Sequence, residues 1–175
     1  ARAGGKAMSL NHHISEELLL SYEAGSLAEG WSLAVATHLA YCQPCRASAG
    51  AAARVGGALL DAIDIAPMRD GAQQSALARI DVVDVEPAAK ANGPKTFNVP
   101  APLRSYIGDD LDGVAWRKLG TGARQFFIST GDAETAVRLL RIPAGAPVPE
   151  HGHRGLELTV ILRGTLVDKD ERFEV

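Results

Sequence analysis

The spacing of apolar residues predicts helices in the first part of the chain. Ser15 can cap a first helix through its hydroxyl group, and Gly25 can end it. The segment Ser26–Glu29 matches a capping box, and Pro44 suits the first turn of a further helix. The four expected helices run from Ser15 to Gly25, from Leu27 to Tyr41, from Pro44 through Ile63, and from Gln73 to Ile80.

The pattern changes after Ile80. Asp81–Pro100 is rich in proline and lacks periodicity, which indicates a linker. From Ala101 onward, short segments of β-branched and aromatic residues alternate with glycine and proline, as in small all-β domains. The predicted fold class is therefore multidomain, α plus all-β, with a helical domain at 8–80, a linker at 81–100 and a β domain at 101–175. The expected strands are Val114–Arg117, Gln125–Ser129, Thr135–Ile142 and Leu156–Leu162.

Composition narrows the classes of function. The 175 residues are enough for two small domains, and 46% of them are hydrophobic. The formal net charge is −3 and no cluster of lysine and arginine is present, so direct nucleic-acid binding is not expected. No apolar run is long enough for a bilayer and no signal peptide is evident, which predicts a soluble cytoplasmic protein. Ala1–Ala7 resembles the remnant of an expression tag before Met8.

A first candidate metal site combines histidine with a Cys-x-x-Cys pair. His38 and Cys42 lie four residues apart, so they share one face of a helix, and Cys45 follows across a Gln-Pro turn. Zinc in structural sites takes four nitrogen and sulfur ligands. The fourth ligand must then come from His13 or its neighbour His12 in the N-terminal arm. The alternatives are a redox dithiol without metal and two inert cysteines in the core.

A second candidate site lies in the β segment. Gly145, His151, His153, Glu157 and Gly164 fit the first motif of the cupins, G-x5-H-x-H-x3-E-x6-G, at every marked position. Residues two apart in a strand point to one side, so both histidines can face a barrel interior. Imidazole and carboxylate suit zinc, iron, manganese or nickel. No histidine follows His153 in the sequence, which leaves three ligands, and the alternative is a solvated His-Gly-His loop.

His13 followed by His38-x3-Cys42-x2-Cys45 resembles the zinc-binding anti-sigma family over Met8–Ile80. The β segment downstream makes the sequence similar to the ChrR-type members. The resemblance implies a small helical bundle with zinc on these four residues. It also implies a 1:1 complex with an extracytoplasmic-function sigma factor, which is thereby kept from RNA polymerase.

The resemblance also implies a role for the β segment. In ChrR-type members a cupin-like β-barrel relays an oxidative signal, singlet oxygen, and this barrel is expected to be incomplete within the 175 residues. The implied second metal, expected to be zinc, would lie on His151, His153 and Glu157. Histidine and thiolate ligands can both be oxidised, which gives a physical reason for sensing near a metal.

Large apolar side chains of the helical domain are candidates for contact with the partner. A domain of about 70 residues cannot easily bury all of them alone, although a role in the bundle core is the alternative. Two rival functions also remain: a metal-dependent cupin enzyme, such as a dioxygenase or isomerase, with a zinc-stabilised helical appendage, and a zinc adaptor for another helical protein. The expected contact residues are Leu18, Leu19, Tyr22, Trp31 and Val35.

Overall fold

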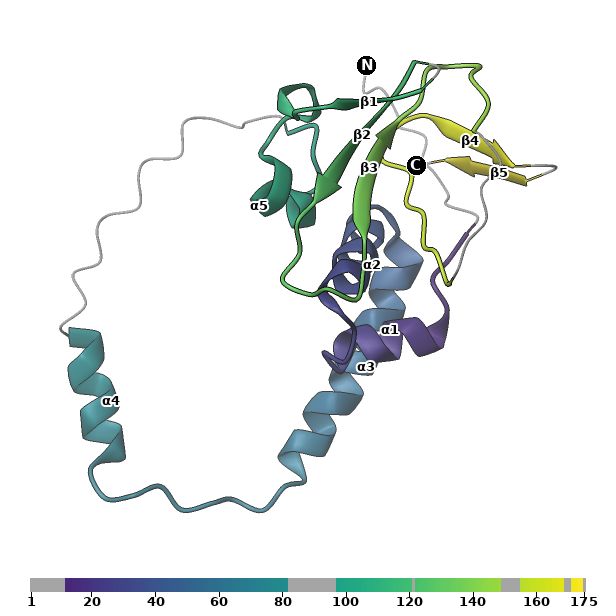
Figure 1. Ribbon diagram of the computed structural model, residues 1–175. Helices are drawn as coiled ribbons and strands as arrows, with labels where there is room; N and C mark the ends of the chain where they lie inside the picture. Colours follow the sequence, from purple (N-terminus) through teal and green to yellow (C-terminus); the bar gives the residue numbers. More distant parts are fainter. Residues whose placement is uncertain (1–11, 82–96, 121, 149–154, 169–170, 175) are drawn as a thin grey trace, which may run out of the picture. The chain divides into compact units, whose positions relative to one another are not determined.

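The computed structural model describes residues 12–81, 97–120, 122–148, 155–168 and 171–174, and it contains helices and antiparallel sheets (Figure 1). All four expected helices are present. In the described part of the chain no helix is both long and apolar enough to cross a membrane. The helices are α1 (Glu16–Glu23), α2 (Glu29–Tyr41), α3 (Gln43–Asp61), α4 (Ala72–Asp81), α5 (Arg104–Ile107) and the 3-10 turns η1 (Ala101–Leu103) and η2 (Leu111–Gly113).

The strands form two separate antiparallel sheets. One has three strands in the order β1-β2-β3, and the other is the β4-β5 hairpin. Among the described residues these sheets do not close into a barrel, so the structure supports a mixed helical and antiparallel fold. The strands are β1 (Arg117–Leu119), β2 (Ala123–Ile128), β3 (Val137–Arg141), β4 (Thr165–Asp168) and β5 (Glu171–Glu174).

Two expected strands differ from the observed ones. Leu156–Leu162 was expected to be a strand but is irregular, and β4 begins only at Thr165. Two of its three leucines pack against cores: Leu158 contacts the helical core and Leu162 contacts the core beneath the sheet, whereas Leu156 is exposed. The expected strand at Val114 begins only at Arg117. In these two segments the apolar pattern therefore predicted buried side chains but not the backbone conformation. The buried side chains pack against the cores without strand pairing.

The described residues divide into two compact units. The first contains residues up to Gly56 together with those from Phe97 onward. The second contains 57–96, with the end of α3 and all of α4. The first unit holds α1, α2, most of α3 and both sheets, and it therefore includes both candidate metal sequences.

Helix α1 begins and ends as its sequence predicts. The Ser15 hydroxyl oxygen accepts a hydrogen bond from the backbone N–H of Leu18 at 3.3 Å. Glu16 and Glu17 occupy the first turn, where the helix dipole favours negative charge. Gly25 has a φ of 67°, and this left-handed conformation ends the helix at little steric cost.

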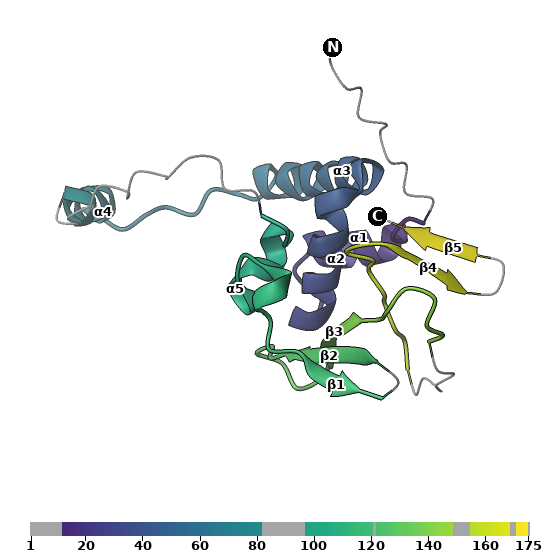
Figure 2. The same cartoon turned by 90° about the horizontal axis from the view of Figure 1, so that it is seen from above.

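Helix α2 lies between α1 and α3 on one side and the β1-β2-β3 sheet on the other (Figures 1 and 2). Its side chains contribute to two hydrophobic cores. On one side Val35 packs with Leu19 of α1 and Ala49 of α3, in the cluster that also contains both cysteines. On the other side Leu33 packs with Leu103 of η1 and with the inner face of the sheet. A single helix thus joins the helical bundle to the β segment within the first unit.

Two carboxylates fix the start of α2 to the β segment. The Glu29 carboxylate accepts hydrogen bonds from the Tyr106 hydroxyl at 2.5 Å and from the backbone N–H of Gly131. Asp132 in turn accepts a hydrogen bond from the backbone N–H of Gly30 at 3.1 Å. The predicted capping box is therefore wrong. Helix α2 begins only at Glu29, its N-cap is Ala28, which has no polar side chain, and the Ser26 hydroxyl donates to the carbonyl oxygen of Ser21 instead.

Candidate metal centre

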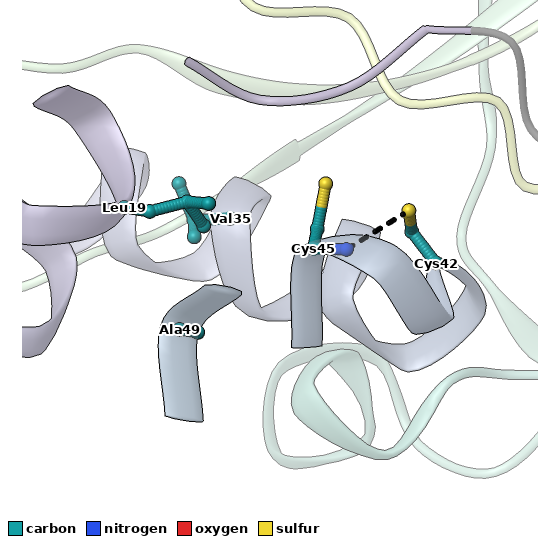
Figure 3. Packing of buried hydrophobic residues seen from close by; sticks show 5 residues of the cluster. All are labelled: Leu19, Val35, Cys42, Cys45 and Ala49. Atoms are coloured by element: carbon teal, nitrogen blue, oxygen red, sulfur yellow. Dashed lines mark hydrogen bonds between the residues drawn. The ribbon is translucent and has the colours of Figure 1, made fainter. Parts of the chain in front are cut away.

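The corner between α2 and α3 places both cysteines. Cys42 adopts an extended conformation that ends α2, and its carbonyl oxygen accepts from the backbone N–H of Arg46 in α3. Its sulfur accepts a hydrogen bond from the backbone N–H of Cys45 at 3.5 Å (Figure 3). Cys42 thus ends one helix and caps the next, which puts its sulfur at the positive end of the α3 dipole.

Four side chains meet at this corner. His38 lies one turn before Cys42 on α2, and His13 reaches in from the arm before α1. The ligand atoms of His13, His38, Cys42 and Cys45 all lie within 4.8 Å of one another. These four residues could hold a metal ion. Both cysteines are buried, whereas His13 is exposed.

The distances between these atoms test whether a tetrahedral ion would fit. His13 Nδ1 lies 3.3 Å from the sulfur of Cys42 and 3.6 Å from that of Cys45. His38 Nε2 lies 3.3 Å from the sulfur of Cys45. With zinc bonds of about 2.3 Å to sulfur and about 2.0 Å to nitrogen, two ligands of a tetrahedron lie about 3.5 Å apart. The observed separations match these edges, so the residues fit a tetrahedral ion with two nitrogen and two sulfur ligands.

Burial shifts the pKa values of two of the four side chains, His38 and Cys45. It lowers the pKa of His38, and the nearby His13 ring lowers it further, so the His38 imidazole is neutral with a lone pair available for a metal. Burial also raises the pKa of the Cys45 thiol, and Cys42 beside it adds to this rise. In the absence of a metal, Cys45 is therefore protonated at neutral pH, and a bound cation would have to displace that proton.

The structure separates the two neighbouring histidines of the arm. His13 belongs to the group of four. The ring of His12 lies instead against Phe173 of β5, with 4.2 Å between the ring centroids. The sequence alone leaves these two residues as rivals for the fourth ligand position, and in the structure only His13 approaches the sulfurs.

The second candidate site is described only in part. His151 and His153 lie outside the described residues, and Glu157 lies in the exposed segment before Leu158. The five expected partner-contact residues fall into two groups. Leu19 and Val35 are core residues, with 3% and 0% of their surfaces exposed. The other three, Leu18, Tyr22 and Trp31, are partly exposed.

A further set of exposed apolar side chains, on the end of α3, on α4 and on the segment between them, was not predicted from the sequence. It lies in the second compact unit, and we call it the exposed strip. Each of its side chains is more than half exposed, and Ile65 reaches 96%. The signal was present in the sequence, since these residues recur through a segment with few apolar partners. The exposed strip consists of Leu59, Leu60, Ile63, Ile65, Met68, Leu77 and Ile80.

Comparison with known proteins gives two informative matches. One is a chain in the crystal structure of Rhodobacter sphaeroides SigE in complex with the anti-sigma ChrR. The match has a TM-score of 0.79 at 44% identity and covers 94% of this chain and 83% of that chain. The anti-sigma-E factor ChrR of Cereibacter sphaeroides is 46% identical over 167 residues, which are 95% of this chain and 76% of the relative. No family model matches the chain.

These matches define the class of protein as the anti-sigma factors, which are regulators and not enzymes. Identity at this level, over about three quarters of the relative, establishes common family membership. The chain belongs to the family of the anti-sigma factor ChrR. The resemblance found in the sequence is thereby confirmed, and the enzyme alternative loses its support.

Proposed function

We propose that this chain binds an extracytoplasmic-function sigma factor in a 1:1 complex and keeps it from RNA polymerase. Membership in the ChrR family supports this proposal, because the related structure is a complex of SigE with ChrR. Sigma factors act on RNA polymerase, so the proposed function also implies a location in the cytoplasm. The partner is a protein, in keeping with the net charge of −3 and the lack of a basic cluster.

The observation that carries the proposal is the exposed strip. Soluble proteins rarely leave so many large apolar side chains in contact with water, and such surfaces mark sites of protein binding. Ile65 and Met68, at 96% and 75% exposure, lie in the irregular segment that joins α3 to α4. A partner that covered these side chains would remove them from water, which favours binding.

Replacing Ile65 with Asp tests this surface directly. Ile65 lies outside any helix, so Ile65→Asp should leave the fold intact while placing a charge in the interface. Loss of an anchor residue costs about 2 kcal/mol or more, so the affinity for the sigma factor should fall about 30-fold in isothermal titration. Leu156→Asp is the matched control, since Leu156 is 83% exposed but lies in the other compact unit. Equal affinities for wild type and Ile65→Asp would remove the exposed strip from the interface.

Three residues of the bundle form a second part of the proposed contact surface. Leu18, Tyr22 and Trp31 are partly exposed. Leu18 and Tyr22 pack against the core cluster that contains Leu19 and Val35, and these two buried residues would support the surface from within. Trp31→Ala should weaken sigma binding more than it lowers the melting temperature. Unchanged affinity with a large loss of stability would assign Trp31 to the core alone.

The metal proposed for the α2–α3 corner is zinc. Its support is the chemistry of the donors: two thiols and two imidazoles at tetrahedral spacing favour zinc over metals that prefer oxygen ligands. Bound zinc would supply no chemistry of its own here and would instead fasten the arm to the two helices. His38 and Cys42 of α2, Cys45 of α3 and His13 of the arm would hold it.

For the β segment we propose a cupin-like barrel with a second divalent metal, zinc, that relays an oxidative signal such as singlet oxygen. The spacing of His151, His153 and Glu157 supports the site, and the oxidisable imidazoles support sensing. Metal analysis of the purified chain tests the site: two equivalents are expected, and His151→Ala together with His153→Ala should leave one. A single equivalent in the unaltered chain would contradict it.

A further inference from the structure

His13 is the weakest-held of the four candidate metal ligands. His38, Cys42 and Cys45 are fixed by α2, α3 and the corner between them, whereas His13 precedes α1 and is exposed. A ligand on an irregular segment must lose conformational freedom each time it binds the metal, and this loss weakens binding unless the segment is already held in place. The arm therefore needs fixed points on both sides of His13.

Both neighbours of His13 provide such points. On the inner side, Ile14 packs against the core cluster that contains Cys42 and Cys45. On the outer side, the ring of His12 lies at 4.2 Å and a tilt of 32° from the ring of Phe173 in β5. The arm is thus held between the helical bundle and the β4-β5 hairpin, with His13 between the two contacts.

The hairpin presents Phe173 toward the arm through its register. Phe173 pairs with Leu166 of β4, so these two side chains share one face of the hairpin, and both are partly buried. Val167 points to the opposite face and is 63% exposed. The face of the hairpin with Phe173 and Leu166 is therefore packed against other parts of the chain, whereas the face with Val167 is exposed and does not contact the arm.

We propose that His12 and Phe173 are positioning residues for the metal site: their ring contact holds the arm so that His13 can complete the tetrahedron. The inference rests on the proposed zinc site and extends it to the C-terminal hairpin. His12 acts through its ring and not as a ligand. The β segment thereby sets the metal affinity of the helical bundle, through a contact between the two ends of the described chain.

The test compares full-length variants loaded with zinc or Co²⁺. The energy of such an aromatic contact corresponds to a factor of about 3 to 10 in an equilibrium constant. His12→Ala and Phe173→Ala should therefore release zinc to a chelator about 3-fold to 10-fold faster than the unaltered chain. In the Co²⁺ form, the tetrahedral d–d absorption should weaken while the sulfur-to-cobalt band remains. The double variant should release zinc no faster than either single variant, because each single substitution already removes the same contact.

Two further variants separate positioning from ligation and from general damage. His12→Phe keeps a ring but cannot bind a metal, so it should release zinc at the unaltered rate. Val167→Ala, on the other face of the same hairpin, should also have no effect. Rapid release from His12→Phe, or unaltered release from Phe173→Ala, would overturn the inference while leaving the zinc proposal intact. An unaltered chain that binds neither metal would overturn the zinc proposal and the inference together.

Discussion

At the scale of single residues, Gly30 shows how closely the helical and β segments approach. A side chain at this position would meet the hydroxyl of Thr135 and would lie 2.6 Å from Val137 Cγ2. Gly30 is buried, and its N–H is bonded to Asp132. Glycine is thus required at the second position of α2 by a neighbour far away in the sequence, a constraint that no local sequence pattern reveals.

Gly30→Ala should lower the free energy of unfolding by about 1–3 kcal/mol, because the added methyl group would overlap with the side chains of Thr135 and Val137. Urea denaturation of the full chain measures the change. Gly57→Ala in α3 is the control, since a methyl group there would meet no atom within 4 Å. The control should be neutral or stabilising by up to about 1 kcal/mol. A neutral Gly30→Ala would show that the two segments do not meet as described.

The cysteines carry the second test at this scale. X-ray absorption of the zinc-loaded His151→Ala/His153→Ala chain, in which only the site at the α2–α3 corner remains, should show two sulfur and two nitrogen neighbours, and adding Cys45→Ser should reduce the sulfur count to one. Loss of outer-sphere support alone weakens metal sites by about 10–100-fold, so loss of a ligand should weaken zinc binding by more than about 100-fold. Ser48→Ala, on the exposed side of the same helix, should change neither quantity. A zinc neighbourhood of oxygen and nitrogen only would contradict the site.

At the scale of elements, the sequence predicted the helices better than the strands. Local signals, such as the Ser15 cap and Pro44 near the start of α3, mark helix ends directly. The His38-Cys42-Cys45 spacing likewise predicted that these three side chains lie together, because a helix and one turn fix their positions. Leu156–Leu162 failed as a strand because Leu158 and Leu162 pack against the helical core and the core beneath the sheet, both built from segments elsewhere in the chain. The contacts of Glu29 and Asp132 could not be predicted, since each joins segments far apart in the sequence.

Asp132 provides a pH test of the contact between α2 and the β segment. Hydrogen bonds from Thr135, first from its hydroxyl and then from its backbone N–H, hold the pKa of Asp132 below its usual value, and the N–H of Gly30 adds to them. A carboxyl group with a lowered pKa stabilises the folded state above its unfolded pKa of about 4, and this stabilisation disappears as the pH falls through the folded value.

Asp132→Ala should therefore be less stable than the unaltered chain at pH 7, and the difference should shrink below about pH 4. The free energy of unfolding of both proteins, measured across this range in urea, gives the comparison. Asp109→Ala is the control, because Asp109 is exposed and has no hydrogen bond among the described residues, so it should show no such dependence. A difference that stays constant down to the lowest pH would assign the loss to packing and not to the charged carboxylate.

At the scale of the whole molecule, α2 connects three features: the candidate metal site at its end, the β segment at its start, and the two cores on its sides. Removal of the metal should therefore act unevenly. In hydrogen exchange, a chelator should reduce protection in α1 and at the start of α3, while β2 and β3 keep theirs, because their core contains no metal ligand among the described residues. If the helices and the sheet lost protection to the same extent, the helical bundle and the β segment would form one cooperative unit whose stability depends on the metal.

The central claim is inhibition of a sigma factor, and transcription in vitro tests it most directly. RNA polymerase core enzyme is combined with the SigE homologue of the same organism and a promoter that this sigma factor recognises. One equivalent of the zinc-loaded chain, added before the polymerase, should abolish the transcript, and Ile65→Asp should require a large excess. Full transcription at a tenfold excess of the unaltered chain would contradict the account.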